Sequence, residues 1–486
     1  MFNVRRMRLW LVLTPLLLAL TALLPATAAA EDGAQQDVHP AVDVYADLFP
    51  GEDIPVIVQS DDVDLSQWVV ELGGTIIQEF DIVGGFQAEM PIEVVEALDL
   101  SDRADWISLD APLMTSRRGG DEPDPSRLET TYPFAANAVP AWEEGISGDD
   151  VTVAVIDTGI SSGADFRGRL DGFQSFNSDG KRSKKDDNGH GTWVAGIIAG
   201  KDAKGRYVGI APGADLLSVK VAGRDGAAHV SDVIEALQWV VENKDRYDIG
   251  VINISLNSAI ADSYLRDPLS AAVEQAWFQG IVVVVSVGNL GATPFAADHA
   301  PANDPFVITV GASDDMGTAD RSDDMLADWS SRGVTVDGYA KPEVVAPGVG
   351  IVSTSAGKRS FLAQEFPDSV VERRYMQLTG SSASAAVVSG MVALMLDEDP
   401  SLTPDEVKFR VIATGSPVPG SAAPAIDVFG ATFTTTEGSA NGEALPNEFI
   451  DPETGTIMED SILWRSILWR SILWRNILWR SILWSR

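Results

Sequence analysis

An aspartate, a histidine and a serine stand at the ends of apolar segments, where the side chains of a hydrolytic site can meet. Asp157 follows the apolar run 151–156, His190 precedes an apolar stretch and is flanked by glycines, and Ser382 opens an apolar segment that continues to Leu396. An imidazole can take the proton of a serine hydroxyl, and a carboxylate can orient that imidazole. The three residue types therefore predict nucleophilic catalysis, with Ser382 as nucleophile and His190 as base.

Each of these residues also has an ordinary structural explanation. Asp157 can be a turn aspartate, His190 a capping or surface residue, and Ser382 a helix cap. Asn289 follows the apolar run 281–287, and it can be either a turn residue or a side-chain donor to an oxyanion. At a helix start, the Ser382 N–H would point outward as a second such donor.

The elements that must position these residues have the pattern of a parallel sheet covered on both faces. Unbroken apolar runs, as expected for strands buried on both sides, alternate with helical patterns over about 131–430. In such sheets, ligands bind at the carboxyl ends of the strands. We expect strands at 151–156, 216–221, 251–255 and 281–287, and helices that include 231–243 and 269–279.

The chain order Asp157, His190, Asn289, Ser382 resembles that of the subtilisin-like serine peptidases. The matching phrases are Val-Ile-Asp-Thr-Gly, His-Gly-Thr, Gly-Asn and Gly-Ser-Ser, which are weak singly and specific in this order. The resemblance covers most of 130–430. It implies a subtilisin-like α/β fold and a serine endopeptidase that acts through an Asp-His-Ser triad and an acyl-enzyme.

The resemblance also implies a role for each residue. Asp157 orients His190, and His190 acts as general base and then as general acid. Ser382 attacks the peptide carbonyl, while Asn289 and the Ser382 N–H bind the oxyanion. No cofactor is required for this chemistry.

The same resemblance implies two edge segments that hold an extended polypeptide substrate. Backbone hydrogen bonds would give affinity with little demand on sequence. Because Leu290 lies at the rim and the pocket segments carry no charge, we expect an apolar residue before the scissile bond. The implied substrate-binding residues are Gly226, Ala227 and Ala228 on one edge, Ser255, Leu256 and Asn257 on the other, and Ser286, Val287 and Gly288 in the first pocket.

Two positions depart from the family pattern. Ala386 stands where the family has a helix-entry proline, which relaxes a fixed φ and puts the rate in doubt. Asn257 stands where the family has glycine, so its side chain is expected in the path of the substrate backbone. These departures keep open the alternative of a catalytically impaired binding protein with the same fold.

The N-terminus predicts export from the cell. Three arginines precede the apolar run 9–24, and the small residues 26–30 follow it. This pattern is typical of a signal peptide, here 1–30. The alternative, a membrane anchor, would need a run of roughly 20 apolar residues. The chain has no cysteine, so disulfides cannot stabilise it outside the cell.

The segment 54–112 predicts a small α+β, ferredoxin-like domain that resembles the inhibitory propeptides of this family. Its elements read strand, helix, strand, strand, helix, strand, and it closes on Ile-Ser-Leu-Asp-Ala-Pro. An independent binding domain is the alternative. Residues 111–130 form a linker rich in Pro, Gly and charge, in which we predict self-cleavage of a zymogen.

The C-terminal part predicts a linker over 431–460 and a repeat tail over 461–486. The tail holds five imperfect copies of Ser-Ile-Leu-Trp-Arg. It could attach the protein to a membrane or cell envelope, pack on the acidic enzyme surface, or bind a partner. An adhesion protein that acts through these repeats is a further alternative for the whole chain.

The net charge and two acidic loops give expectations about partners and metal ions. The formal charge of −36 argues against nucleic acid as a partner. A structural calcium ion is expected on family resemblance, with oxygen ligands from acidic loops. The loops are Asp314-Asp315 and Asp323-Asp324.

Overall fold

The computed structural model describes residues 37–457, except for 61, 63, 102, 116–129, 178–182, 443 and 453. These residues form two compact units, one ending at Ala111 and the other spanning Pro112–Thr456. The predicted signal peptide 1–30, the repeat tail 461–486 and most of the predicted maturation region 111–130 lie outside the described residues. No helix in the described part of the chain is both long and apolar enough to cross a membrane.

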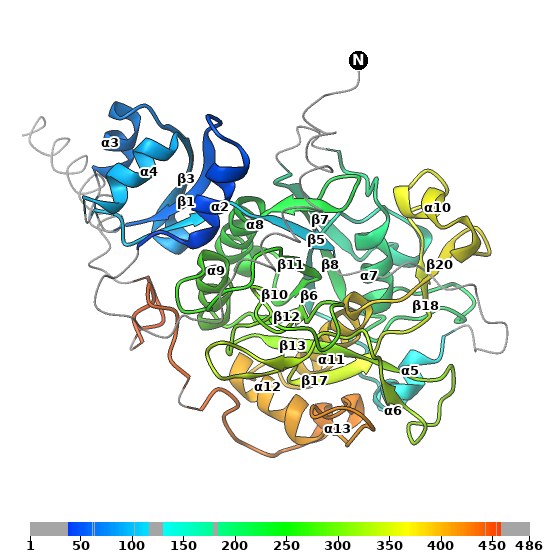
Figure 1. The fold of residues 1–486 in the computed structure, drawn as a ribbon. Coiled ribbons are helices and arrows are strands. Elements are labelled where there is room, and N and C mark those ends of the chain that lie inside the picture. The colour runs from blue at the N-terminus through cyan, green and yellow to red at the C-terminus, as the bar shows by residue number, and fades with distance from the viewer. Residues whose placement is uncertain are drawn as a thin grey trace, which may run out of the picture. The chain divides into compact units, whose positions relative to one another are not determined.

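The N-terminal unit contains a four-stranded antiparallel sheet in the order β2-β3-β1-β4 (Figure 1). The chain runs strand, helix, strand, strand, helix, strand, so the predicted α+β fold of this unit is confirmed. Its elements are α2 (Pro40–Leu48), β1 (Ile54–Gln59), α3 (Leu65–Glu71), β2 (Thr75–Phe80), β3 (Gly85–Met90), α4 (Ile92–Asp99) and β4 (Trp106–Leu109).

Helix α2 lies before the predicted start of this unit at residue 54. The His39 N–H donates to the Ile107 carbonyl at 2.8 Å, and Val38 pairs with the same strand. Ala41 and Val42 of α2 are buried. Residues 37–48 therefore pack with this unit ahead of its predicted start at residue 54, and the polar composition of 31–52 hides the short helix.

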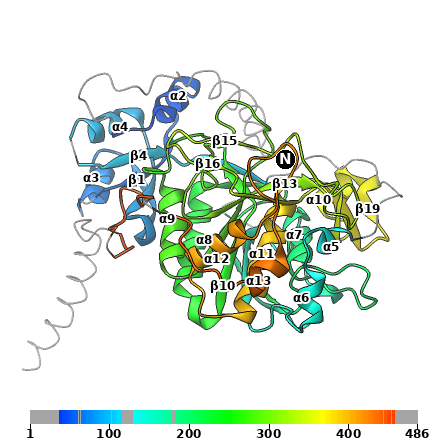
Figure 2. The same ribbon diagram turned by 90° about the horizontal axis from the view of Figure 1, so that it is seen from below.

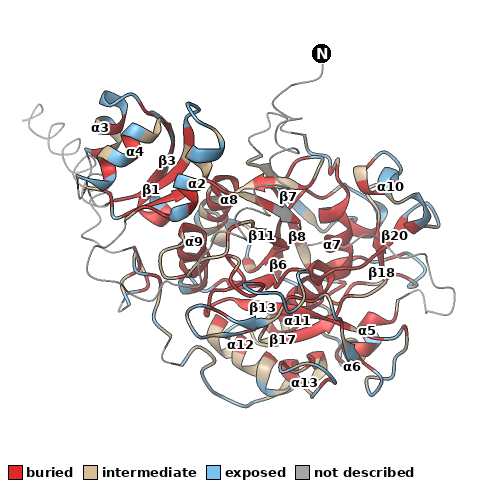
Figure 3. Cartoon of the chain, viewed as in Figure 1, coloured by how far each residue is buried: buried red, intermediate tan, exposed pale blue. Residues whose placement is uncertain are grey.

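The large unit is built on an eight-stranded sheet in the order β14-β13-β12-β10-β6-β8-β7, with β17 paired to β13. All its strand pairs are parallel except β13 with β14. The central strands are buried along their length (Figure 3), as their unbroken apolar runs predict. The strands are β6 (Thr152–Asp157), β7 (Leu170–Ser175), β8 (Asp215–Lys220), β10 (Ile249–Ile254), β12 (Val282–Ser286), β13 (Ile308–Asp314), β14 (Met325–Leu326) and β17 (Val344–Pro347).

Two pairs of helices cover the two faces of this sheet (Figure 2). Helices α7 (His190–Ala199) and α11 (Ser381–Glu398) pack on each other, and so do α8 (Val230–Glu242) and α9 (Pro268–Phe278). Helix α11 is buried from Ser381 to Met395, so its apolar surface contacts protein all round. The predicted doubly covered α/β sheet is confirmed.

Shorter elements surround this sheet. The strands β5 (Pro112–Thr115), β9 (Ala227–His229) and β11 (Leu256–Ser258) form a sheet of their own. Two further small sheets contain β15 (Gly333–Val334) and β16 (Ala340–Lys341), and β18 (Ile351–Thr354), β19 (Val370–Val371) and β20 (Tyr375–Leu378). The remaining helices are α5 (Tyr132–Ala135), α6 (Val139–Glu143), α10 (Phe361–Glu365), α12 (Pro404–Ala413) and α13 (Val428–Phe433).

The described part of the predicted linker 431–460 packs on the large unit as a strap. Helix α13 crosses the predicted boundary at 430. Asn447 is fully buried, and its N–H lies 3.0 and 2.9 Å from the two carboxylate oxygens of Glu274. The Tyr264 hydroxyl donates to the Leu445 carbonyl at 2.7 Å. These contacts attach described residues of 431–456 to the large unit, and a polar composition does not reveal such contacts with distant helices.

A buried pair of carboxyl groups lies beneath this strap. Glu274 and Asp304 are both fully buried, and their side chains interact. Burial and the neighbouring Asp304 charge raise the pKa of Glu274 well above its usual range. Burial also raises the pKa of Asp304 to about 7, although the nearby Lys341 and Lys408 oppose the shift. Protonation of the pair therefore stabilises the folded state.

We expect Asp304→Asn to become more stable relative to its parent as the pH rises from about 4 to 7. The raised pKa of Asp304 means that its contribution to the unfolding free energy is present at low pH and is lost as the pH approaches 7. The asparagine side chain does not titrate, so the unfolding free energy of the variant does not fall in this way as the pH rises. Chemical unfolding of both proteins in a Ser382→Ala background measures the difference, and a difference independent of pH contradicts the expectation.

Candidate active site

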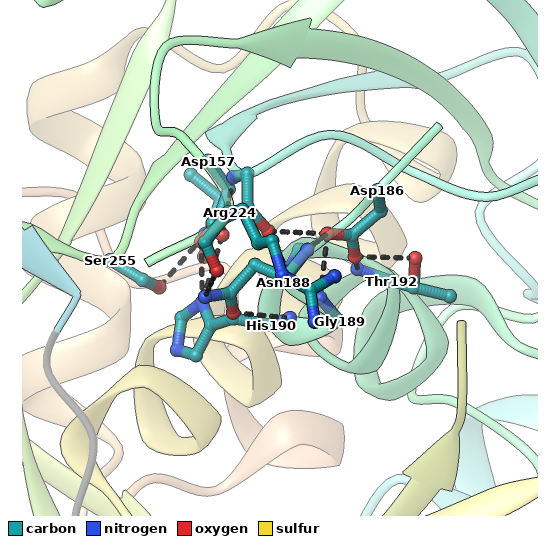
Figure 4. A network of polar contacts seen from close by, with 11 residues as sticks. Asp157, Asp186, Asn188, Gly189, His190, Thr192, Arg224 and Ser255 are labelled. Atoms are coloured by element: carbon teal, nitrogen blue, oxygen red, sulfur yellow. Dashed lines mark hydrogen bonds and ion pairs between the residues drawn. The ribbon is translucent and has the colours of Figure 1, made fainter. Parts of the chain in front are cut away.

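Asp157 and His190 form a fully buried pair (Figure 4). Asp157 is the last residue of β6 and His190 is the first of α7. The His190 Nδ1 atom lies 2.8 Å from Oδ1 and 2.9 Å from Oδ2 of Asp157. The Thr158 N–H also donates to Asp157 Oδ1, at 2.7 Å. The carboxylate therefore holds the imidazole so that Nδ1 carries the proton.

The other ring nitrogen of His190, Nε2, is not bonded to Asp157. Nε2 is buried, and within the described residues no group hydrogen-bonds to it. With Nδ1 held as a donor to Asp157, Nε2 is an acceptor. An unpartnered buried acceptor is costly, and such groups are concentrated at functional sites. Nε2 is therefore suited to accept a proton.

Gly191 lets the start of α7 approach β6. A Cβ atom at Gly191 would lie 2.3 Å from the Gly159 carbonyl oxygen and 3.1 Å from Asp157 Oδ1. The 2.3 Å distance is too short for any Cβ contact, and its partner is a backbone oxygen, so the backbone would have to shift; the 3.1 Å distance is tighter than most Cβ contacts. The glycine after His190 thus permits the Asp157 contact.

Ser382 lies in the first turn of α11, and its side chain is fully buried. Helix α11 packs against α7, the helix that begins at His190. The Ser382 N–H is one of the first helical N–H groups, which have no acceptor within the helix. Ala386, the departure from the family proline, is fully buried, and α11 continues through it unbroken.

Asn289 is oriented by the residue before the serine. Its Oδ1 accepts the Ser381 N–H at 3.1 Å. Its Nδ2 is buried and has no hydrogen-bond partner among the described residues. The Ser381 hydroxyl in turn accepts the Gly288 N–H at 3.2 Å. The loop after β12 is thus bonded to the start of α11, and the Asn289 amide retains donor capacity for an oxyanion.

Strand β5 lies between the two predicted substrate edges. It pairs antiparallel with β11, with Thr115 opposite Leu256, and antiparallel with β9, with Leu113 opposite Ala228. The Thr115 N–H donates to the Gly226 carbonyl at 3.4 Å. The segments 226–228 and 255–257 are thus brought together around one extended strand, as a bound polypeptide would require.

Gly226 is needed for this close pairing. Its φ is +85°, and a Cβ atom there would lie 2.9 Å from Thr115 Oγ1 and 3.2 Å from Asn188 Nδ2. A side chain would therefore meet both strand β5 and the segment before His190.

The side chain of Asn257 is directed toward the end of β12. Its Nδ2 donates to the Ser286 carbonyl at 2.9 Å. We expected this side chain to project into the path of the substrate. It instead joins β11 to the end of β12. Ser286 and Val287 are buried, and Leu290 is 47% exposed at the rim.

Asp186 is a residue that the motif comparison missed. It is buried four residues before His190, and its carboxylate accepts hydrogen bonds from groups on both sides of the Asp157–His190 pair (Figure 4). Burial raises its pKa. The available signal was an aspartate in the loop that leads into His190, which is too common to be specific.

The motif comparison also missed Arg224, which forms hydrogen bonds to three separate segments of the chain. Its guanidinium donates to the Arg359 carbonyl at 3.2 Å and to Gln364 Oε1 at 2.6 Å. Its carbonyl accepts the Asn188 side-chain N–H at 2.8 Å. The segment before His190 is thereby connected to the β9 edge and to α10. No sequence spacing links these residues.

The structural calcium ion stays a prediction from the family resemblance. No group of three or more acidic, histidine or cysteine side chains there is arranged to hold a metal ion. Asp323 is engaged by the Thr318 hydroxyl at 3.1 Å, and Asp315 accepts the Thr131 hydroxyl at 2.7 Å. Burial and the neighbouring carboxylates raise the pKa of Asp324 to about 7.

A family model described as the subtilase family matches residues 148–441. The chain belongs to the subtilase family. It is 42% identical over 271 residues to the serine protease AprX of Bacillus subtilis (strain 168), a match that covers 54% of this chain and 60% of that protein. It is 31% identical over 362 residues to the alkaline elastase YaB of Bacillus sp. (strain YaB), covering 74% and 78%.

The fold is also that of a solved subtilase. The structure of fervidolysin from Fervidobacterium pennivorans, a keratinolytic enzyme related to subtilisin, matches with a TM-score of 0.62 and 24% identity. The match covers 79% of this chain and 61% of that one. The predicted family and the subtilisin-like fold are confirmed.

We expect Gly191→Ala to lower the kcat of this subtilase about 100-fold, because displacement of His190 by the new Cβ disturbs a geometry that catalysis needs to a fraction of an ångström. Peptide hydrolysis measures the change. Gly163→Ala is the matched control, since a Cβ atom there meets nothing within 4 Å. Equal activity of the two variants would contradict the expectation.

Proposed function

We propose that this subtilase is a secreted serine endopeptidase that hydrolyses polypeptides through Asp157, His190 and Ser382. The observation that carries the proposal is the buried Asp157–His190 pair, which leaves Nε2 without a partner in the described chain. Similarity to proteins named serine protease and alkaline elastase supports the reaction class. The predicted signal peptide supports secretion.

The reaction divides into two acyl transfers. His190 Nε2 takes the Ser382 hydroxyl proton as the oxygen attacks the peptide carbonyl, and Asp157 stabilises the imidazolium that forms. Asn289 Nδ2 and the Ser382 N–H donate to the oxyanion. His190 then protonates the leaving amine, and an ester on Ser382 remains. Water enters, loses a proton to His190 and releases the acid, which restores the serine.

Extended main-chain pairing supports binding of many polypeptides with limited selectivity. Both edge segments already pair with β5 through backbone groups. Leu113 of β5 is fully buried, which supports a requirement for an apolar residue at its position in a substrate. We propose that apolar residues are also preferred before the scissile bond, next to Leu290.

A test of the catalytic assignment compares Ser382→Ala and Asn289→Ala with the wild type. We expect loss of Ser382 to lower kcat about 10⁴- to 10⁶-fold and to abolish labelling by a fluorophosphonate. Loss of the Asn289 donor is expected to lower kcat about 100- to 1,000-fold while KM changes little. A folded wild type that neither hydrolyses peptides nor reacts with the probe would instead fit a catalytically impaired binding protein.

The position of strand β5 supports self-cleavage within the predicted region 111–130. β5 begins directly after the N-terminal unit and runs antiparallel to β11, whose start follows Ser255 beside Asp157 (Figure 4). The chain from Pro112 to Thr115 therefore leads toward the triad. We propose that the scissile bond lies beyond Thr115 within 111–130 and that the N-terminal unit is an inhibitory propeptide.

N-terminal sequencing of secreted protein tests this maturation. We expect the mature chain to begin between residues 116 and 130 and the Ser382→Ala variant to keep the whole N-terminal unit. A processed Ser382→Ala chain, or a wild type that stays intact and fully active, contradicts self-cleavage. Attachment of the enzyme to the cell surface through 461–486 stays a prediction from sequence.

A further inference from the structure

Asp186 accepts hydrogen bonds from groups that adjoin both members of the catalytic pair. Its Oδ1 accepts the Thr158 hydroxyl at 2.9 Å, the Asn188 N–H at 3.1 Å and the Gly189 N–H at 2.7 Å. Its Oδ2 accepts the N–H and the hydroxyl of Thr192, at 2.9 and 2.7 Å. One carboxylate therefore contacts the residue after Asp157 and residues before and after His190.

Thr158 extends this connection. Its hydroxyl donates to Asp186 and accepts the Gly191 N–H at 2.9 Å. The hydroxyl thus joins the end of β6 to the first turn of α7. The Asn188 side chain accepts the His190 N–H at 3.2 Å, so the backbone of His190 is held from the same loop.

The start of α7 has no cap of its own. Its N-cap residue is Gly189, which has no side chain, and the first helical N–H groups need external acceptors. Asp186 supplies both the acceptors and a negative charge at the positive end of the helix. The Lys220 ammonium lies near enough to favour that charge.

Only a carboxylate satisfies this arrangement. All five groups that face Asp186 are donors, and an ionised carboxylate is an acceptor on both oxygens. An asparagine would turn its NH₂ group toward donors on one side. A buried donor that faces another donor loses its hydrogen bond and stays desolvated.

We propose that Asp186 is a positioning residue that sets the geometry between Asp157 and His190 by bonding the end of β6 to the start of α7. This inference rests on the proposed peptidase function. A purely structural cap would change stability alone, whereas a positioning residue also changes the Asp157–His190 hydrogen bond and the chemical step.

The test uses Asp186→Asn in the full chain. We expect kcat to fall about 10- to 100-fold with a smaller change in KM, since the altered bonds hold the end of β6 and the start of α7 and a small displacement of His190 slows the chemistry. In the Ser382→Ala background, we expect the far-downfield proton signal of the His190 Nδ1–Asp157 bond to shift or broaden.

Asp427→Asn is the matched control. Asp427 also accepts a helix N-terminal N–H, that of Gly430 at 2.9 Å, but it lies at α13. We expect this variant to lose stability while kcat and the downfield signal stay as in the wild type. Thr158→Val, which removes the bridging hydroxyl, replaces Asp186→Asn if that variant does not fold.

Two results separate this inference from the proposed function. In the first result, the wild type hydrolyses peptides, and the Asp186→Asn variant keeps the wild-type kcat and downfield signal. Asp186 then has no positioning role. The same conclusion applies if Thr158→Val is used in its place and keeps both. If the wild type itself is inactive, the peptidase proposal fails, and the downfield signal in the Ser382→Ala background still decides whether Asp186 sets the Asp157–His190 bond.

Discussion

The buried hydrogen bond between Asp157 and His190 is the constraint on which the rest of the site depends. Neither side chain contacts water, so the bond operates where electrostatic interactions are strong and unpaired groups are costly. It determines which ring nitrogen carries the proton and therefore which one can act on Ser382. The glycine at 191 and the carboxylate at 186 both serve the approach of α7 to β6 that this bond requires.

A parallel sheet without disulfides must hold these ends in place by packing and polar contacts. The chain has no cysteine, and its core strands and α11 are almost completely buried. Buried ionic groups add to this packing: Glu343 lies 2.5 Å from the Lys341 ammonium and 3.0 Å from that of Lys408. The C-terminal strap closes over the neighbouring Glu274. Such buried ions require partners on every side, which makes the arrangement specific.

The facing edges of β9 and β11 are covered by strand β5 of the chain itself. Unpaired backbone groups on β9 and β11 would bind any extended polypeptide, which is useful to a peptidase and hazardous before export. Pro112–Thr115 satisfies both edges at once. In the proposed function, the same backbone pairing accounts for binding of an extended substrate and for a first cleavage in the segment that follows the N-terminal unit.

The sequence by itself determined the family and the doubly covered sheet, and it singled out Asp157, His190, Asn289 and Ser382 as candidates, because apolar runs and short motifs are local features of the chain. Only the tertiary structure decided the contacts of Asp186 and Arg224, the direction of the Asn257 side chain and the attachment of Leu445 and Asn447 to the large unit. These depend on contacts between residues far apart in sequence, such as Asn447 with Glu274, and composition carries no record of such pairings. A polar segment with the composition of a linker is held on the large unit here because its Asn447 N–H donates to the buried carboxyl group of Glu274.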